Sequence, residues 1–171
     1  MLILITEILI FTISIPILIF YFRFSKFLFL SLSVSAVTAF LLEIVNERIF
    51  LQHGTFYPFS LLRFPFFQFP VAIVLLGGLY AGTIDFFALK ITKGIKNRLF
   101  AFLVFTFSVL IFNLSSIFVE KTGILLEYWI HRIDISNLYP WFYLYYLTFV
   151  LSGSFFSLPE VFKKEDKKKT R

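Results

Sequence analysis

Long blocks of apolar residues alternate with short polar segments along the chain, and this pattern predicts five membrane-spanning helices. The blocks cover residues 2–22, 27–45, 71–89, 99–119 and 141–158. Each has about the 20 residues that an α-helix needs to cross the hydrocarbon core of a bilayer. We therefore expect an all-α, polytopic transmembrane helical bundle that forms a single domain over residues 1–158, followed by a basic tail over residues 159–171.

Composition points to the same class of protein. The chain is 59% hydrophobic and 15% charged, whereas soluble domains are about 45–50% apolar and about 25% charged. The bilayer is thus the expected solvent, with membrane lipids as partners, and we expect a multi-pass protein of the cell membrane. The absence of cysteine excludes disulfides and cysteine-based metal or catalytic sites.

The positive charges are concentrated on one side of the predicted bundle. Of the 16 Lys and Arg residues, twelve lie in segments 23–26, 90–98 and 159–171, and four lie in the other connections. Cytoplasmic loops of membrane proteins carry the excess of Lys and Arg, so we expect the N-terminus outside and the C-terminus inside. The net charge of +6 then reflects topology and lipid contact, and no nucleic-acid-binding motif accompanies it.

Most acidic residues and both histidines fall on the outer side under this topology. Glu43 and Glu47 are four residues apart on one helix face, and Glu127 and His131 have the same spacing in a helix expected over 124–133. These two faces could meet across an outer cavity. Burial in an apolar pocket favours the protonated form of a carboxylic acid, which can act as a general acid. These four residues are our candidate catalytic group.

Two other interpretations of these acids stay open. Glutamates at span ends commonly form interfacial ion pairs, here with Arg48 or Arg132. The spacing of Glu127 and His131 could also supply two ligands to a divalent metal, with a third from another segment. No complete ligand motif is present, so the sequence predicts no metal and no other cofactor.

An internal similarity relates the two acidic segments. Residues 41–49 and 125–133 share five of nine positions, and each segment is followed by a Tyr-Pro pair, at Tyr57-Pro58 and Tyr139-Pro140. The two copies lie about half the chain apart. A duplicated unit of span, cap and span is therefore one hypothesis for the fold.

Small and acidic residues within the spans suggest further features. Asp85 lies near the cytoplasmic end of the third span, where it could hydrate, pair with Lys90 or serve an intramembrane function. Gly78 and Gly82 form a small-x-x-x-small face, which predicts close helix packing or a homo-oligomer interface. Serines in the second and fifth spans would serve the same purpose.

Two segments of the chain resemble the carotenoid hydratase family of membrane proteins. An acid at a span end, Glu43, is followed by Gly54-Thr-Phe-Tyr57-Pro58 and then by Pro65-Phe-Phe-Gln-Phe-Pro70. The stretch from Glu127 to Tyr139-Pro140-Trp141 is similar in kind to that family's later acid, aromatic and proline segment. The Gly-Trp pair that closes the segment in the family is missing after Trp141. The resemblance implies acid-initiated addition of water to an isoprenoid double bond, with Glu43 and Glu127 as proton donors.

The sequence thus favours an outer-side acidic and aromatic cavity that binds or modifies a lipid or isoprenoid. The candidate substrate-binding residues are His53, Tyr57, Tyr139 and Trp141. The alternative is a non-catalytic membrane assembly subunit or scaffold, and a small transporter is less favoured because no pair of discontinuous helices is evident. A shared site requires the acids to converge, whereas a scaffold leaves them scattered on the rim of the bundle.

Overall fold

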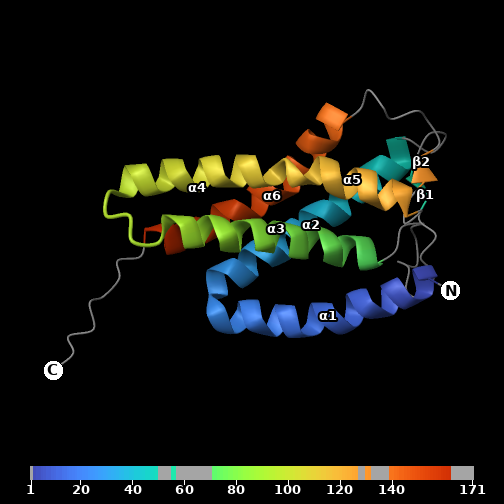
Figure 1. The fold of residues 1–171 in the computed structure, drawn as a ribbon, viewed down its shortest axis with the longest axis horizontal. Helices are drawn as coiled ribbons and strands as arrows, with labels where there is room; N and C mark the ends of the chain where they lie inside the picture. Colours follow the sequence, from blue (N-terminus) through green and yellow to red (C-terminus); the bar gives the residue numbers. More distant parts are fainter. Residues whose placement is uncertain (1, 50–54, 57–70, 127–129, 132–138, 163–171) are drawn as a thin grey trace.

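The computed structural model describes residues 2–49, 55–56, 71–126, 130–131 and 139–162 (Figure 1). At residues 2–3, 46–49, 55–56, 130–131 and 139 it describes the backbone alone. In chain order the elements are α1 (Leu2–Phe24), α2 (Lys26–Ile49), β1 (Thr55–Phe56), α3 (Val71–Thr92), α4 (Arg98–Asn113), α5 (Ser115–Leu125), β2 (Ile130–His131) and α6 (Tyr139–Val161).

Five segments within the described ranges are long and apolar enough to cross a membrane, which confirms the predicted helical bundle. Four of them correspond to α1, α2, α3 and α6. The fourth in chain order, Arg98–Leu125, is made of α4 and α5 together. It extends beyond the predicted 99–119, and a break at Leu114 divides it, with α4 ending at Asn113 and α5 beginning at Ser115.

The helices α2, α3, α4 and α6 form the core of the bundle, and α1 packs at its side against α2 and α3 (Figure 1). Of the apolar window in α3, 44% is buried, against 17% in α1, so α3 is central and α1 is peripheral. The main core cluster consists of Ala39, Ala81, Ile84, Ala88, Phe105, Val109, Phe149 and Val150.

Glycines on α3 and α6 allow α2 to approach both helices closely. A Cβ atom added at Gly78 would lie 2.9 Å from the Cβ of Ala36, and one added at Gly153 would overlap the backbone carbonyl of Ser31. Gly78 and Gly82 are both buried within the chain. The small-residue face is therefore used for packing inside one molecule, and a homo-oligomer through it stays a prediction.

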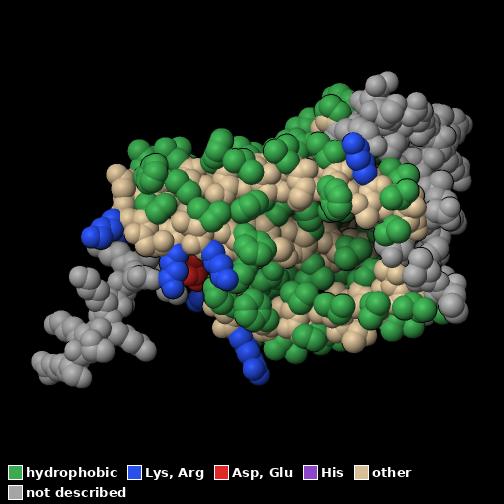
Figure 2. All heavy atoms as spheres, in the orientation of Figure 1, with side chains coloured by type: hydrophobic (Ala, Val, Ile, Leu, Met, Phe, Trp, Pro, Cys, Tyr) green, Lys and Arg blue, Asp and Glu red, His purple; other side chains and the backbone are tan. Residues whose placement is uncertain are grey.

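The two ends of the bundle differ in charge. The basic end, where α1 joins α2 and α3 joins α4, carries Arg23, Lys26, Lys90, Lys93, Lys96 and Arg98. At the opposite end, the sheet end, β1 and β2 pair antiparallel with Thr55 opposite His131. Figure 2 shows a largely hydrophobic face between the two ends, with most of the visible Lys and Arg side chains at the basic end. The predicted orientation, with the basic end in the cytoplasm, stays a prediction.

The helix predicted over 124–133 is wrong. Helix α5 ends at Leu125, and Ile130–His131 forms a two-residue strand. The segment Tyr128-Trp129-Ile130 contains aromatic and β-branched residues, which favour extended backbone over helix. Glu127 and His131 therefore do not share a helix face. Their four-residue spacing no longer places the two side chains together.

The duplicated unit is also not seen in the backbone. Residues 41–49 are helical throughout and end α2 at Ile49, whereas the second copy, residues 125–133, includes the end of a helix and a strand. Equal sequence positions in the two copies thus have different backbone structure.

Candidate functional site

Two buried carboxyl groups in the sheet-end half of the bundle are each hydrogen-bonded to a tyrosine of α6. Glu43 of α2 is 5% exposed and accepts a hydrogen bond from the Tyr145 hydroxyl at 2.6 Å. Glu120 of α5 is 4% exposed and accepts one from the Tyr146 hydroxyl at 3.3 Å. Consecutive residues of a helix point about 100° apart. Tyr145 and Tyr146 can therefore reach carboxyl groups on two different helices.

The two pairs lie side by side in one aromatic cluster. The ring centroids of Tyr145 and Tyr146 are 5.9 Å apart, and Tyr80 of α3 packs edge-on against Tyr146 at 5.4 Å. Phe149, one turn further along α6, contacts all three rings. Glu43, Glu120, Tyr145 and Tyr146 thus form one group, which we call the carboxyl–tyrosine site.

The break between α4 and α5 places further polar atoms beside this site. The Tyr80 hydroxyl lies 3.0 Å from the Ser115 hydroxyl and donates to the backbone carbonyl of Asn113 at 3.3 Å. The side-chain amide of Asn113 donates to the backbone carbonyl of Tyr143 at 3.1 Å. The side-chain oxygen of Asn113 is buried without a hydrogen-bond partner. Because buried polar atoms are normally paired, this oxygen could accept a hydrogen bond from water or from a ligand hydroxyl.

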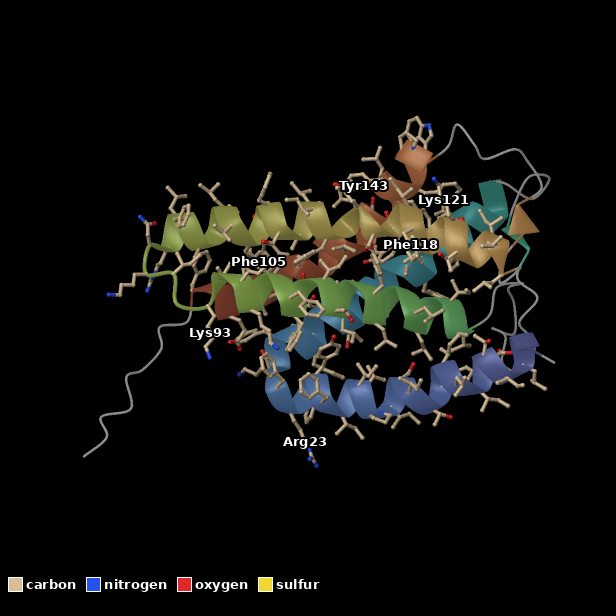
Figure 3. All side chains as sticks on the ribbon, viewed as in Figure 1. Arg23, Lys93, Phe105, Phe118, Lys121 and Tyr143 are labelled. Carbon is tan, nitrogen blue, oxygen red and sulfur yellow. The ribbon has the colours of Figure 1, made fainter. Side chains whose placement is uncertain are left out.

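The sheet-end half is the more acidic half of the membrane-embedded bundle. Figure 3 shows Tyr143 and Lys121 toward this end, and Arg23 and Lys93 at the basic end. Glu7, near the start of α1, is fully buried and is a third carboxyl group in the sheet-end half, after Glu43 and Glu120. Buried carboxyl groups in membrane-spanning helices are rare and mark functional sites by default.

Asp85 belongs to a separate polar cluster in the basic-end half. It is fully buried and accepts hydrogen bonds from the hydroxyls of Ser154 at 2.5 Å, Ser157 at 2.8 Å and Ser31. The sequence left open a pairing with Lys90, but the Lys90 amine lies over an aromatic ring of its own helix, 4.6 Å from the ring centroid. The side chain of Asp85 is also inaccessible to water, so the alternative of hydration at the membrane edge is wrong.

The structure describes the side chain of one of the four predicted catalytic residues. Glu43 lies in the carboxyl–tyrosine site. Glu47 follows one turn later on α2, and His131 lies in β2, but only the backbone is described at these two positions. Glu127 lies outside the described residues.

The predicted substrate-binding residues are described in part. His53 and Tyr57 lie outside the described residues, and Tyr139 begins α6 with only its backbone described. Trp141, on the first turn of α6, is 66% exposed. Its ring is therefore open to the surrounding membrane or its interface.

Three of the four members of the carboxyl–tyrosine site were not predicted from the sequence. Glu120 directly follows the apolar block 99–119, so it was expected in a connection, whereas α5 continues to Leu125. Tyr145 and Tyr146 lie inside the apolar block 141–158 and were not singled out. Their position inside an apolar span was the one sequence feature that could have indicated this role. A tyrosine hydroxyl buried there usually needs a hydrogen-bond partner, such as a carboxyl group.

No protein-family model, curated protein or solved structure matches the chain. Within the described ranges, no group of three or more His, Cys, Asp or Glu side chains is placed to hold a metal ion. The chemistry of the site must therefore be inferred from its own residues.

Proposed function

We propose that this integral membrane protein binds or modifies a lipid or isoprenoid at the carboxyl–tyrosine site. The observation that supports this most is the convergence of Glu43 and Glu120, from α2 and α5, on adjacent tyrosines of α6 at 2.6 and 3.3 Å. Acids that served only as interfacial ion-pair partners would not need to converge at a buried position. Ionisable groups are costly within a membrane and are retained where they serve a site.

The site combines apolar walls with a proton source. The rings of Tyr80, Tyr145 and Tyr146 pack around the buried Phe149 and give the carboxyl groups aromatic, apolar surroundings that suit an unsaturated hydrocarbon chain. A carboxyl group in such surroundings favours its protonated form and can transfer the proton to a double bond. The Tyr145 hydroxyl, hydrogen-bonded to Glu43, would hold this carboxyl group in one orientation.

The resemblance to the carotenoid hydratase family makes addition of water the specific reaction that we propose. The O–H bond of the Glu43 carboxyl breaks as a C–H bond forms at one alkene carbon. Water adds to the carbocation at the other carbon and returns a proton to the carboxylate. Glu120 serves as the second carboxyl group of the site, and the unpartnered side-chain oxygen of Asn113 is a suitable acceptor to orient the water.

The proposal places the site in the outer leaflet of the cell membrane. Segments 23–26, 90–98 and 159–171, which include or follow the helix ends at the basic end, hold twelve of the 16 Lys and Arg residues, so on the positive-inside rule we place this end in the cytoplasm. The sheet end, with the buried acids, then faces outward. A lipid or isoprenoid could reach the site from within the bilayer.

Mass spectrometry of lipids that co-purify with the detergent-solubilised protein tests the proposal. Wild type should retain a specific lipid or isoprenoid. Glu43→Gln and Glu120→Gln should each retain about tenfold less of it or carry a chemically altered form, because each change removes a carboxylic acid from the site, and a loss of about 1.4 kcal/mol in binding is a tenfold change. Glu160→Gln is the matched control. Glu160 accepts a hydrogen bond from the Ser25 hydroxyl at 2.7 Å at the basic end, so its replacement should change nothing.

Finding only bulk lipid, in equal amounts in wild type and all three variants, would contradict the proposal. That result would favour the alternative, a non-catalytic membrane assembly subunit whose acids have a structural role.

A further inference from the structure

The polar cluster around Asp85 has no part in the proposed function. Asp85 lies on α3, and its hydrogen-bond donors come from two other helices, Ser31 from α2 and Ser154 and Ser157 from α6. All four residues are buried. The cluster therefore joins the three most closely packed helices of the bundle in its basic-end half.

Among the residues that the structure describes, the carboxyl group of Asp85 has hydroxyl donors but no cationic partner. Ser154 donates to Oδ1, and Ser31 and Ser157 donate to Oδ2. Considering residues 2–49, 71–126 and 139–162, Asp85 makes no ion pair with Lys, Arg or His. A single negative charge at this depth is costly, so it must be neutralised by a proton or by a bound cation.

A fourth hydroxyl lies beside the cluster without a partner of its own. Ser35, one turn after Ser31 on α2, is fully buried, and its hydroxyl makes no hydrogen bond. Both hydroxyls face the same backbone position of α6. A Cβ atom at Gly153 would overlap the Ser35 hydroxyl and lie 2.9 Å from that of Ser31. The Ser35 hydroxyl is therefore close to the Ser31 hydroxyl, which donates to Asp85.

We propose that Asp85 and the surrounding serine hydroxyls bind a sodium ion within the membrane. A carboxylate with neutral oxygen ligands suits a hard cation. The single negative charge of Asp85 balances a monovalent ion, whereas a divalent ion would leave net charge in the bilayer. The Ser154 hydroxyl can donate to the backbone carbonyl of Val150 at 2.9 Å, which leaves its lone pairs for the ion. The hydrogens of the Ser31 and Ser157 hydroxyls can also rotate, which would turn the lone pairs of these oxygens toward the ion.

Thermal unfolding of the full chain in detergent tests this proposal. Wild type is compared in sodium chloride and in choline chloride at equal ionic strength, because choline is too large for the site. At a sodium concentration ten times the Kd, Tm should rise by about 3–5 °C, since a ligand that binds only the folded state stabilises it.

Two variants identify the site, and one serves as the control. Asp85→Asn should abolish the rise in Tm. Ser35→Ala should reduce the rise without lowering Tm in choline, because the Ser35 hydroxyl gives up no hydrogen bond. Ser116→Ala also removes a buried hydroxyl, on α5, and should leave the response to sodium intact. If Asp85→Asn does not fold, the sodium-dependent rise in Tm of Ser35→Ala still tests the proposed site.

Two results would overturn the sodium site. Equal Tm values for wild type in sodium and choline would mean that Asp85 is neutralised by a proton instead. A full sodium response in Ser35→Ala would mean that the ion, if bound, lies elsewhere. Neither result bears on lipid retention at the carboxyl–tyrosine site, so the two proposals fail independently.

Discussion

Replacing Gly153 by alanine should lower the free energy of unfolding by about 3 kcal/mol or more, the upper range for overpacking a buried position. The added Cβ would overlap the backbone carbonyl of Ser31, which cannot rotate away, and the hydroxyl of Ser35. Helices α2 and α6 would have to separate. Their separation would also break the hydrogen bonds that bring serines from both helices to Asp85.

Gly94→Ala is the matched control, because it makes the same chemical change in the turn between α3 and α4. A Cβ atom at Gly94 meets nothing within 4 Å. The φ angle there is +87°, so alanine should lose about 1–2 kcal/mol through backbone strain alone. Thermal or denaturant unfolding in detergent measures both variants. Equal losses for the two would contradict the close approach of α2 and α6.

Removing the Tyr145 hydroxyl should have the second-largest effect. Tyr145→Phe should destabilise the protein by about 2 kcal/mol, within the range for leaving a buried hydrogen-bond acceptor without its donor. The bond to Glu43 is short, at 2.6 Å, and the carboxyl group that accepts it is 5% exposed. Water therefore has little access to replace the lost donor.

Tyr143→Phe provides the comparison, since it removes the same hydroxyl from the same helix. The Tyr143 hydroxyl donates to the backbone carbonyl of Leu110 at 3.2 Å, and a bond between neutral groups contributes about 1 kcal/mol. Unfolding measurements on the two variants should thus differ by about 1 kcal/mol. A larger loss for Tyr143→Phe than for Tyr145→Phe would show that the Glu43–Tyr145 pair is not a stabilising contact.

The five-span architecture follows from the sequence because the bilayer imposes one simple requirement, a run of about 20 apolar residues for each helix. The ends of the helices do not follow as directly. Helix α2 continues through the polar residues 46–48 to Ile49, since a helix satisfies its backbone hydrogen bonds whether its side chains are apolar or not. The break at Leu114 and the pairing of β1 with β2 depend on contacts between distant segments, which periodicity does not reveal.

The candidate site was predictable only in part, for a similar physical reason. Glu43 stands out as an acid at the end of an apolar block. Its partner Tyr145 lies 102 residues away, and their meeting depends on the packing of α2 against α6. Asp85 stands out as an intramembrane acid, but Ser31 and Ser154 were interpreted as small packing residues, and Ser157 was not singled out. Their hydroxyls reach one carboxyl group only because α2, α3 and α6 pack together at this level of the bundle, which the sequence of each helix alone does not reveal.

The central claim is that Glu43 and Glu120 belong to one ligand site, and a double-mutant cycle on ligand retention tests it most directly. The amount of co-purifying lipid or isoprenoid is measured for wild type, Glu43→Gln, Glu120→Gln and the double variant. Residues that act on one ligand are coupled, so the double variant should lose little more than the more severe single variant. Losses that multiply in the double variant would show that the two carboxyl groups act independently, and would contradict a shared site.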